Sequence, residues 1–128
     1  MKAIAALLLL APIPVQAADL TIRTGESWVF GVKGGQPVGA RKVDAKAMPA
    51  KGQIKVSVKA MLGTALFVTN NSSTAYTFRA ELLSGGKSSA ARTCSLPANG
   101  KPAFEQWPQK ADAVRLGTFK VTGDGGKC

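Results

Sequence analysis

The chain has 128 residues, carries 17 Lys and Arg against 7 Asp and Glu, and contains no histidine. The absence of histidine excludes Ser-His-Asp and Cys-His catalysis and removes the commonest zinc ligand. The length suits one domain with a modest core, and the net charge of +10 would attract polyanions.

The first 17 residues have the pattern of a signal peptide. Lys2 precedes the apolar run Ala3–Ala11, and Val15 and Ala17 stand where signal peptidase requires small residues. Cleavage after Ala17 would leave residues 18–128 as one domain with a net charge of +9, since Lys2 is lost. No later stretch approaches the roughly 20 apolar residues of a membrane span. We therefore expect a periplasmic or secreted protein without a transmembrane segment.

The remaining chain has the pattern of about eight short strands separated by turns rich in Gly, Asn, Ser and Pro. The first two predicted strands are Asp19–Arg23 and Glu26–Val32, and the second places Trp28, Phe30 and Val32 on one face, where a tryptophan usually belongs to the core. The other predicted strands are Gln36–Ala45 (an edge strand), Ile54–Lys59, Leu62–Thr69, Ala75–Leu82, Ser88–Leu96 (with Cys94) and Ala113–Val121.

The clearest pattern lies between Ile54 and Leu96. The run Ile54–Lys59 alternates strictly between apolar and polar residues, as does Ala75–Leu82. With the apolar run that precedes the turn at residues 70–73, these runs predict three neighbouring strands in the middle of the fold. Further on, the apolar period slips by one residue at Gly117, which predicts a β-bulge there.

This pattern favours an all-β fold, an antiparallel two-sheet sandwich that is immunoglobulin-like in outline; a small β-barrel is the alternative. The Cys…Trp…Cys arrangement of antibody domains is absent, so the likeness concerns architecture only. The two cysteines, Cys94 and Cys128, predict a disulfide in an exported protein. A bond to a partner or a free redox thiol are the alternatives, although no Cys-x-x-Cys motif is present.

No motif in the sequence predicts catalysis, a metal site or a cofactor. Residues 85–88 imitate the end of a phosphate-binding loop, but Glu81 stands where that motif requires glycine, so a hairpin turn is the better interpretation. The scattered carboxylates could serve a hydrolase only if the fold brought two of them to within roughly 5 to 9 Å of each other. They include Glu26, Glu81, Glu105 and Asp112.

Two groups of residues are candidates for binding. The densest positive charge predicts a polyanion patch at Arg41, Lys42, Lys46, Lys51, Lys55 and Lys59, although lysines on outward strand faces also serve solubility. Phe104 and Trp107 lie in a proline-framed segment that we expect to be a loop. Their rings could bind a ligand there or cap the open end of the core.

Several segments resemble small uncharacterised exported proteins of Gram-negative bacteria. They are Glu26–Phe30, Asn70–Ala80, Cys94 and Phe104–Pro108. The resemblance covers most of the mature chain and implies an envelope location, but it implies no activity, catalytic residue or ligand.

Together these features predict a non-enzymatic binding or structural module of the periplasm or the secreted fraction. Its partner would be an envelope protein that adds a strand at an exposed edge such as Gln36–Ala45, or an anionic envelope polymer bound between Arg41 and Lys59. Nucleic acid is not the expected partner. The alternative is an envelope hydrolase that uses the scattered carboxylates.

Overall fold

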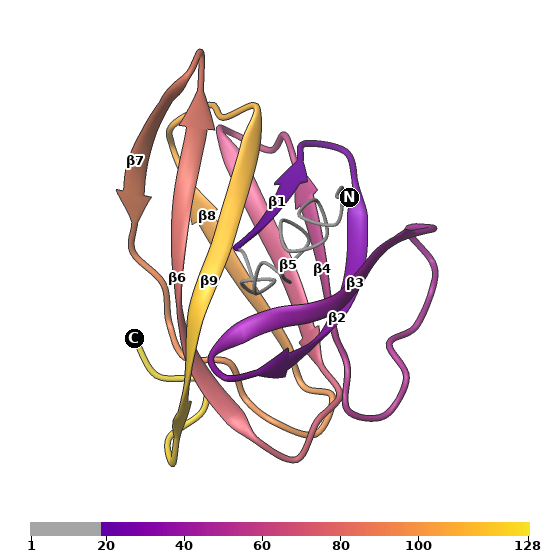
Figure 1. The fold of residues 1–128 in the computed structure, drawn as a ribbon. Coiled ribbons are helices and arrows are strands. Elements are labelled where there is room, and N and C mark those ends of the chain that lie inside the picture. Colours follow the sequence, from indigo (N-terminus) through magenta and orange to yellow (C-terminus); the bar gives the residue numbers. More distant parts are fainter. Residues whose placement is uncertain (1–18) are drawn as a thin grey trace, which may run out of the picture.

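A computed structural model gives the fold of residues 19–128, so the predicted signal peptide lies outside the described residues. This part of the chain forms nine strands and no helix (Figure 1). None of the described residues forms a helix of the length and apolarity that a membrane crossing requires. The strands are β1 (Leu20–Arg23), β2 (Ser27–Lys33), β3 (Gln36–Val43), β4 (Ile54–Lys59), β5 (Thr64–Asn70), β6 (Ala75–Ser84), β7 (Lys87–Ala91), β8 (Pro102–Trp107) and β9 (Ala113–Thr122).

The strands form two antiparallel sheets that pack face to face. The four-stranded sheet has the order β1-β9-β6-β7, and the five-stranded sheet has the order β3-β2-β4-β5-β8. Figure 1 looks onto the four-stranded sheet, with β4, β5 and β8 behind it. The predicted two-sheet sandwich is confirmed, and each sheet keeps two edge strands, so the alternative of a closed barrel is wrong.

The core lies between the sheets and follows from the alternating pattern of the sequence. In β4, Ile54, Val56 and Val58 point inward and are almost fully buried, whereas Lys55, Ser57 and Lys59 point to the other side of the sheet. In β2, Phe30 is fully buried, and Trp28 and Val32 pack against the core from the same side, as predicted. Burial of a large apolar side chain of this kind stabilises the fold by about 1.5 to 3 kcal/mol.

A bulge in β9 keeps the core continuous. Thr77 pairs with Lys120 and Arg79 pairs with Gly117, so two residues of β9 stand opposite Phe78. The predicted bulge is confirmed beside Gly117, and the extra residue turns Phe119 inward. The Phe119 ring stacks on Phe78 with centroids 5.7 Å apart and lies 5.6 Å from the ring of Phe30, which joins the two sheets.

The prediction of three neighbouring central strands is wrong. Strands β4 and β5 pair with each other, but β6 belongs to the other sheet. The turn between β5 and β6 is a crossover organised by Asn70, whose side chain is 1% exposed. Its amide donates to the Thr74 carbonyl (2.8 Å) and the Pro97 carbonyl (3.2 Å), and its oxygen accepts from the Ser72 hydroxyl (2.7 Å). The sequence signal of a turn was correct, but a turn does not reveal whether the next strand stays in the same sheet.

Two further boundaries differ from the prediction. Strand β7 ends at Ala91, so Cys94 lies in a connection rather than in a strand, and the segment expected to be a loop forms β8, which pairs with β5. After Ala91 the chain no longer continues the β6–β7 ladder, and side-chain hydrogen bonds attach it to β6 and β8 instead. The Thr93 hydroxyl donates to the Phe78 carbonyl (2.8 Å), and the Trp107 indole donates to the Arg92 carbonyl (2.9 Å).

The predicted disulfide between Cys94 and Cys128 is confirmed. Hydrogen bonds hold the same two segments together beside it. The Ser95 N–H donates to the Lys127 carbonyl (2.7 Å), and the Gly126 N–H donates to the Ser95 carbonyl (3.0 Å). The residues after β9 are therefore attached to the β7–β8 connection by both a covalent bond and a short backbone ladder.

Candidate functional site

The side of the five-stranded sheet that points away from the core is the candidate site, and we call it the outer face. Strand pairing places Arg41, Val29, Lys55 and Thr69 in one row across β3, β2, β4 and β5. Residues two positions away on each strand share this side. The outer face consists of Ser27, Val29, Arg41, Val43, Lys55, Ser57, Lys59, Ala65, Phe67, Thr69, Pro102, Phe104 and Gln106. Of these, Ser27, Val29, Ser57 and Ala65 are buried beneath their neighbours.

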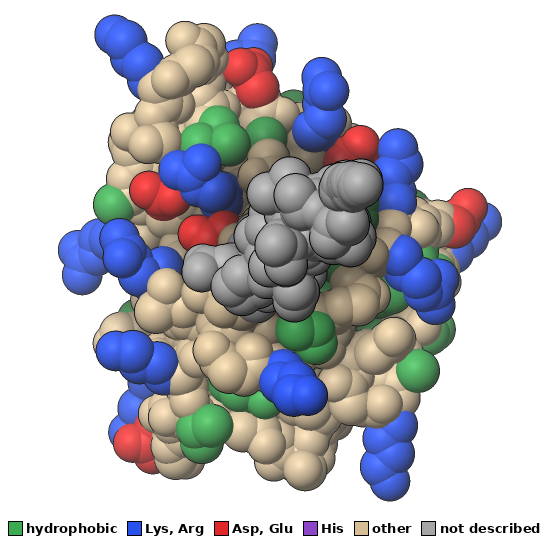
Figure 2. Space-filling model, viewed as in Figure 1, with side chains coloured by type: hydrophobic (Ala, Val, Ile, Leu, Met, Phe, Trp, Pro, Cys, Tyr) green, Lys and Arg blue, Asp and Glu red, His purple; other side chains and the backbone are tan. Residues whose placement is uncertain are grey.

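The outer face carries three cations and, among the described residues, no carboxylate. Arg41 and Lys59 are exposed, and Lys55 is half-buried because its ammonium donates to the Ala45 carbonyl in the connection after β3. The opposite side of the molecule differs. Figure 2 looks onto the four-stranded sheet and shows Lys and Arg side chains interspersed with Asp and Glu. On that sheet Arg115 forms an ion pair with Glu81 at 2.7 Å.

A pair of aromatic rings lies beside these cations. Phe67 and Phe104 stand directly opposite each other on β5 and β8, with ring centroids 4.9 Å apart and an interplanar angle of 57°. The Lys59 ammonium lies 5.0 Å from the centre of the Phe67 ring, within the range of a cation–π contact. Phe104 remains 49% exposed. The outer face thus combines exposed positive charge with an accessible aromatic surface.

Not every residue of the predicted polyanion patch reaches the outer face. Arg41, Lys55 and Lys59 lie on it, and Lys46 and Lys51 lie on the exposed connection between β3 and β4. Lys42 points to the other side of β3.

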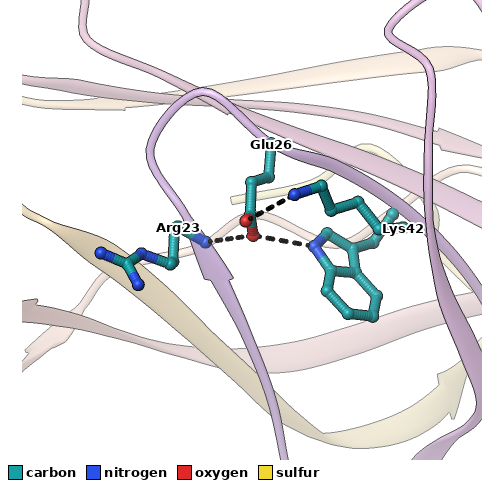
Figure 3. Close-up of polar contacts among 4 residues, drawn as sticks. Arg23, Glu26 and Lys42 are labelled. Carbon is teal, nitrogen blue, oxygen red and sulfur yellow. Dashed lines mark hydrogen bonds and ion pairs between the residues drawn. The ribbon is translucent and has the colours of Figure 1, made fainter.

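The charge of Lys42 is balanced by Glu26. The Lys42 ammonium lies 3.2 Å from the Glu26 carboxylate, which also accepts from the Trp28 indole (3.0 Å) and the Arg23 N–H (3.1 Å) (Figure 3). These donors, chiefly the Trp28 indole, hold the pKa of Glu26 below its ordinary value. Lys42 therefore adds little to the attraction of a polyanion.

The two aromatic residues predicted for loop binding lie on opposite faces of β8. Phe104 points outward, whereas Trp107 points inward and is only 7% exposed. The structure therefore places Trp107 in the position of a core cap and brings Phe104 to Phe67 instead. Phe67 could not be predicted as an outward residue because it lies in the continuous apolar run of β5. Only the pairing with the alternating strand β4 shows that Leu66 and Val68 point inward and Phe67 outward.

The carboxylates considered for hydrolysis each have a separate structural partner. Glu26 and Glu81 form the ion pairs described above, and Asp112 accepts from the Gly85 N–H (3.0 Å). Within residues 19–128, no group of three His, Cys, Asp or Glu side chains could hold a metal ion.

Glu105 is the carboxylate with the most unusual environment. It points inward from β8 beside a surface hollow of about 330 Å³ that Trp107 and the disulfide help to line. Burial raises the pKa of Glu105, and the hydrogen bond from the Cys94 N–H (2.6 Å) partly opposes that rise. This bond makes Glu105 a connector between β8 and the disulfide-bearing segment.

Comparisons of the chain with protein-family models, curated proteins and solved structures gave no match. The chemistry of the outer face is therefore the basis for a functional proposal.

Proposed function

We propose that the protein is an exported, non-enzymatic module that binds an anionic envelope polymer on its outer face. The observation that carries this proposal is the exposed Phe104 ring packed on Phe67 beside Lys59, on a sheet face whose other charges are also positive. The disulfide supports an oxidising compartment such as the periplasm or the extracellular space.

The spacing of the cations favours a polymer over a small anion. Lys55 and Lys59 are four residues apart on one strand, which corresponds to about 13 Å, and Arg41 lies two strands away from Lys55, which corresponds to about 10 Å. No single small anion reaches charges so far apart. A polymer with a negative group on each repeating unit can contact several of them at once.

The aromatic pair adds an apolar contact that is independent of charge. Sugar rings present C–H groups on their faces, and these pack against exposed aromatic rings. With Phe104 about half exposed, the pair offers such a surface next to the Lys59 ammonium. A negatively charged polysaccharide therefore matches the outer face better than a purely phosphate-based chain.

Binding of polygalacturonate, measured by isothermal titration calorimetry, tests the proposal, with neutral dextran as the control polymer. We expect the affinity to fall steeply between about 50 and about 300 mM NaCl, because exposed charges are screened within roughly one Debye length. The double variant Lys55→Glu/Lys59→Glu should bind about tenfold more weakly or worse, which corresponds to about 1.4 kcal/mol or more.

A matched variant separates the outer face from the overall charge. Lys120→Glu/Lys127→Glu changes the net charge by the same amount at exposed positions away from the outer face, and we expect it to lose less than about twofold in affinity. Equal losses in both double variants would mean that the overall charge alone drives binding. That result, or undetectable binding by the wild type, would contradict the proposal. Phe104→Ala should weaken binding even at high salt, where the charges contribute least.

A further inference from the structure

The described residues contain four strand edges whose backbone groups face away from any partner strand, on β1, β3, β7 and β8. Such edges can accept a strand from another polypeptide, and proteins usually protect them with proline, bulges, charge or short length. Three of the four are protected in this way. β1 has only four residues, and β8 begins with Pro102.

The edge strand β3, which the sequence favoured for strand addition, is protected twice. Pro37 lacks an N–H group, and Gly39 forms a bulge. Val29 pairs with Arg41 whereas Gly31 pairs with Val38, so β3 has one residue more than β2 between these pairs. Gly39 has a φ of 60°, which places it in the left-handed region. An added strand could not keep a regular register along this edge.

The edge of β7 lacks proline and bulges, and its charged residues, Lys87 and Arg92, stand at its ends and not along it. Its pairing with β6 is unbroken from the pair Ser84 and Lys87 to the pair Ala80 and Ala91. The strand contains neither proline nor glycine. The side chains from Ser88 to Ala90 are small and exposed. They therefore leave room for a neighbouring strand.

The hairpin turn shows which backbone groups of β7 face outward. Gly85 and Gly86 have φ values of 57° and 83°, as in a type I′ turn, so Ser84 and Lys87 form the hydrogen-bonded pair that closes the hairpin. In an antiparallel ladder such pairs alternate with pairs that direct their N–H and C=O groups away from each other. The free groups of β7 therefore belong to Ser88 and Ala90.

Positive charge surrounds this edge and indicates the chemistry of its partner. Lys87 begins β7, Arg92 follows its last residue, and Lys110 lies across a hollow of about 390 Å³ that Lys87 and Ser89 also line. If a second copy of the chain paired antiparallel through Ser88 and Ala90, Lys87 of one copy would stand opposite Ala91 of the other, beside Arg92. Like charges would then meet at both ends of the pairing, which is unfavourable.

We propose that the β7 edge accepts an extended acidic segment of a partner protein as an additional strand of the four-stranded sheet. The Ser88 and Ala90 backbone groups form the ladder, and Lys87, Arg92 and Lys110 contact the acidic side chains. This site is separate from the outer face, because it belongs to the other sheet.

Titration of ¹⁵N-labelled protein with a seven-residue peptide of alternating Glu and Val tests this proposal by NMR. We expect saturable shifts at β7 and slower solvent exchange of the Ser88 and Ala90 amides by about tenfold or more, as hydrogen bonding requires. The same peptide with every backbone nitrogen methylated keeps its charge but loses all of its donors, and it should not bind. This control leaves the protein unchanged, so it remains informative if a protein variant fails to fold.

Ala90→Pro removes a free N–H that β6 does not use, and it should abolish peptide binding while the outer face still binds polygalacturonate. Shifts confined to Lys55, Lys59 and Phe104 would overturn the proposal, because the peptide would then bind only as a polyanion on the outer face. Equal binding of the methylated peptide, or the absence of saturable binding, would also overturn it. A wild-type dimer that Ala90→Pro dissociates would show that a second copy occupies the edge, and this too would contradict the proposal.

Discussion

Breaking the disulfide should lower the free energy of unfolding by about 4 kcal/mol. The two cysteines are 34 residues apart, and closing a loop of this length removes about 13 cal/mol/K of chain entropy from the unfolded state. At 298 K this corresponds to about 4 kcal/mol. The entropy of unfolding of residues 19–128 is about 230 cal/mol/K at roughly 2.1 cal/mol/K per residue, so the loss corresponds to a decrease in Tm of about 15 to 20 °C.

Differential scanning calorimetry of the wild type and of Cys94→Ala/Cys128→Ala measures this difference. Ser95→Ala is the matched control, because it keeps the disulfide and removes the hydrogen bonds that the Ser95 hydroxyl donates to the Asp124 carbonyl (2.6 Å) and accepts from the Lys127 N–H (2.8 Å). We expect the control to lose about 1 to 3 kcal/mol, less than the double variant.

If the Tm of the double variant decreased by less than about 5 °C, the entropic reasoning would be refuted. It would mean that the backbone ladder between Ser95 and the C-terminal residues keeps the loop nearly closed without the covalent bond, or that the unfolded chain is already compact. Hydrogen exchange of the Gly126 amide, which donates to the Ser95 carbonyl, distinguishes these two causes.

Three further predictions concern single residues. Because burial raises the pKa of Glu105 in the folded state, stability is lost as the pH rises from the ordinary Glu pKa through the raised one. Urea unfolding should therefore show Glu105→Gln gaining stability relative to the wild type as the pH rises above the ordinary Glu pKa, and a pH-independent difference would contradict this cause. Glu26 has a lowered pKa, so its contribution is present above the ordinary Glu pKa and is lost as the pH falls; the deficit of Glu26→Gln at neutral pH should vanish in acid. Gly63→Ala should destabilise the fold by about 3 kcal/mol or more, because its Cβ would collide with the backbone of Trp107 and Pro108 at a φ of 110°. Gly85→Ala, which meets no atom within 4 Å, should cost only about 1 to 2 kcal/mol from its positive φ, and similar Tm losses for both variants would contradict the steric cause.

Strands whose inner residues are apolar and whose outer residues are polar could be predicted from the sequence. β4 has the predicted limits, because Ile54, Val56 and Val58 alternate with Lys55, Ser57 and Lys59. The bulge in β9 could also be predicted, since a strand whose apolar period slips by one residue needs an extra residue there to keep its apolar side chains on the core face. The disulfide followed from the pair of cysteines in a chain that the sequence predicts to be exported.

Strand β8 could not be predicted because it reverses the usual pattern. Its outward residue Phe104 is aromatic and its inward residue Glu105 is charged. Glu105 is tolerated inside because it accepts from the Cys94 N–H, a partner 11 residues away that no local pattern identifies. The same limit applies to the candidate site. The Phe67–Phe104 pair requires the register between β5 and β8, which is a property of the whole sheet.

The position of β9 has a consequence for the order of folding. This strand lies between β1 and β6, so the four-stranded sheet has no centre until the chain has been made beyond residue 113. The hairpins β2–β3, β4–β5 and β6–β7 form between neighbouring segments and can assemble as the chain emerges, whereas β1 must wait for a strand about 90 residues later. Until then Phe78 on β6 lacks the ring of Phe119, its stacking neighbour from β9 in the same sheet. The four-stranded sheet of this topology is therefore completed only after the last strand has been made.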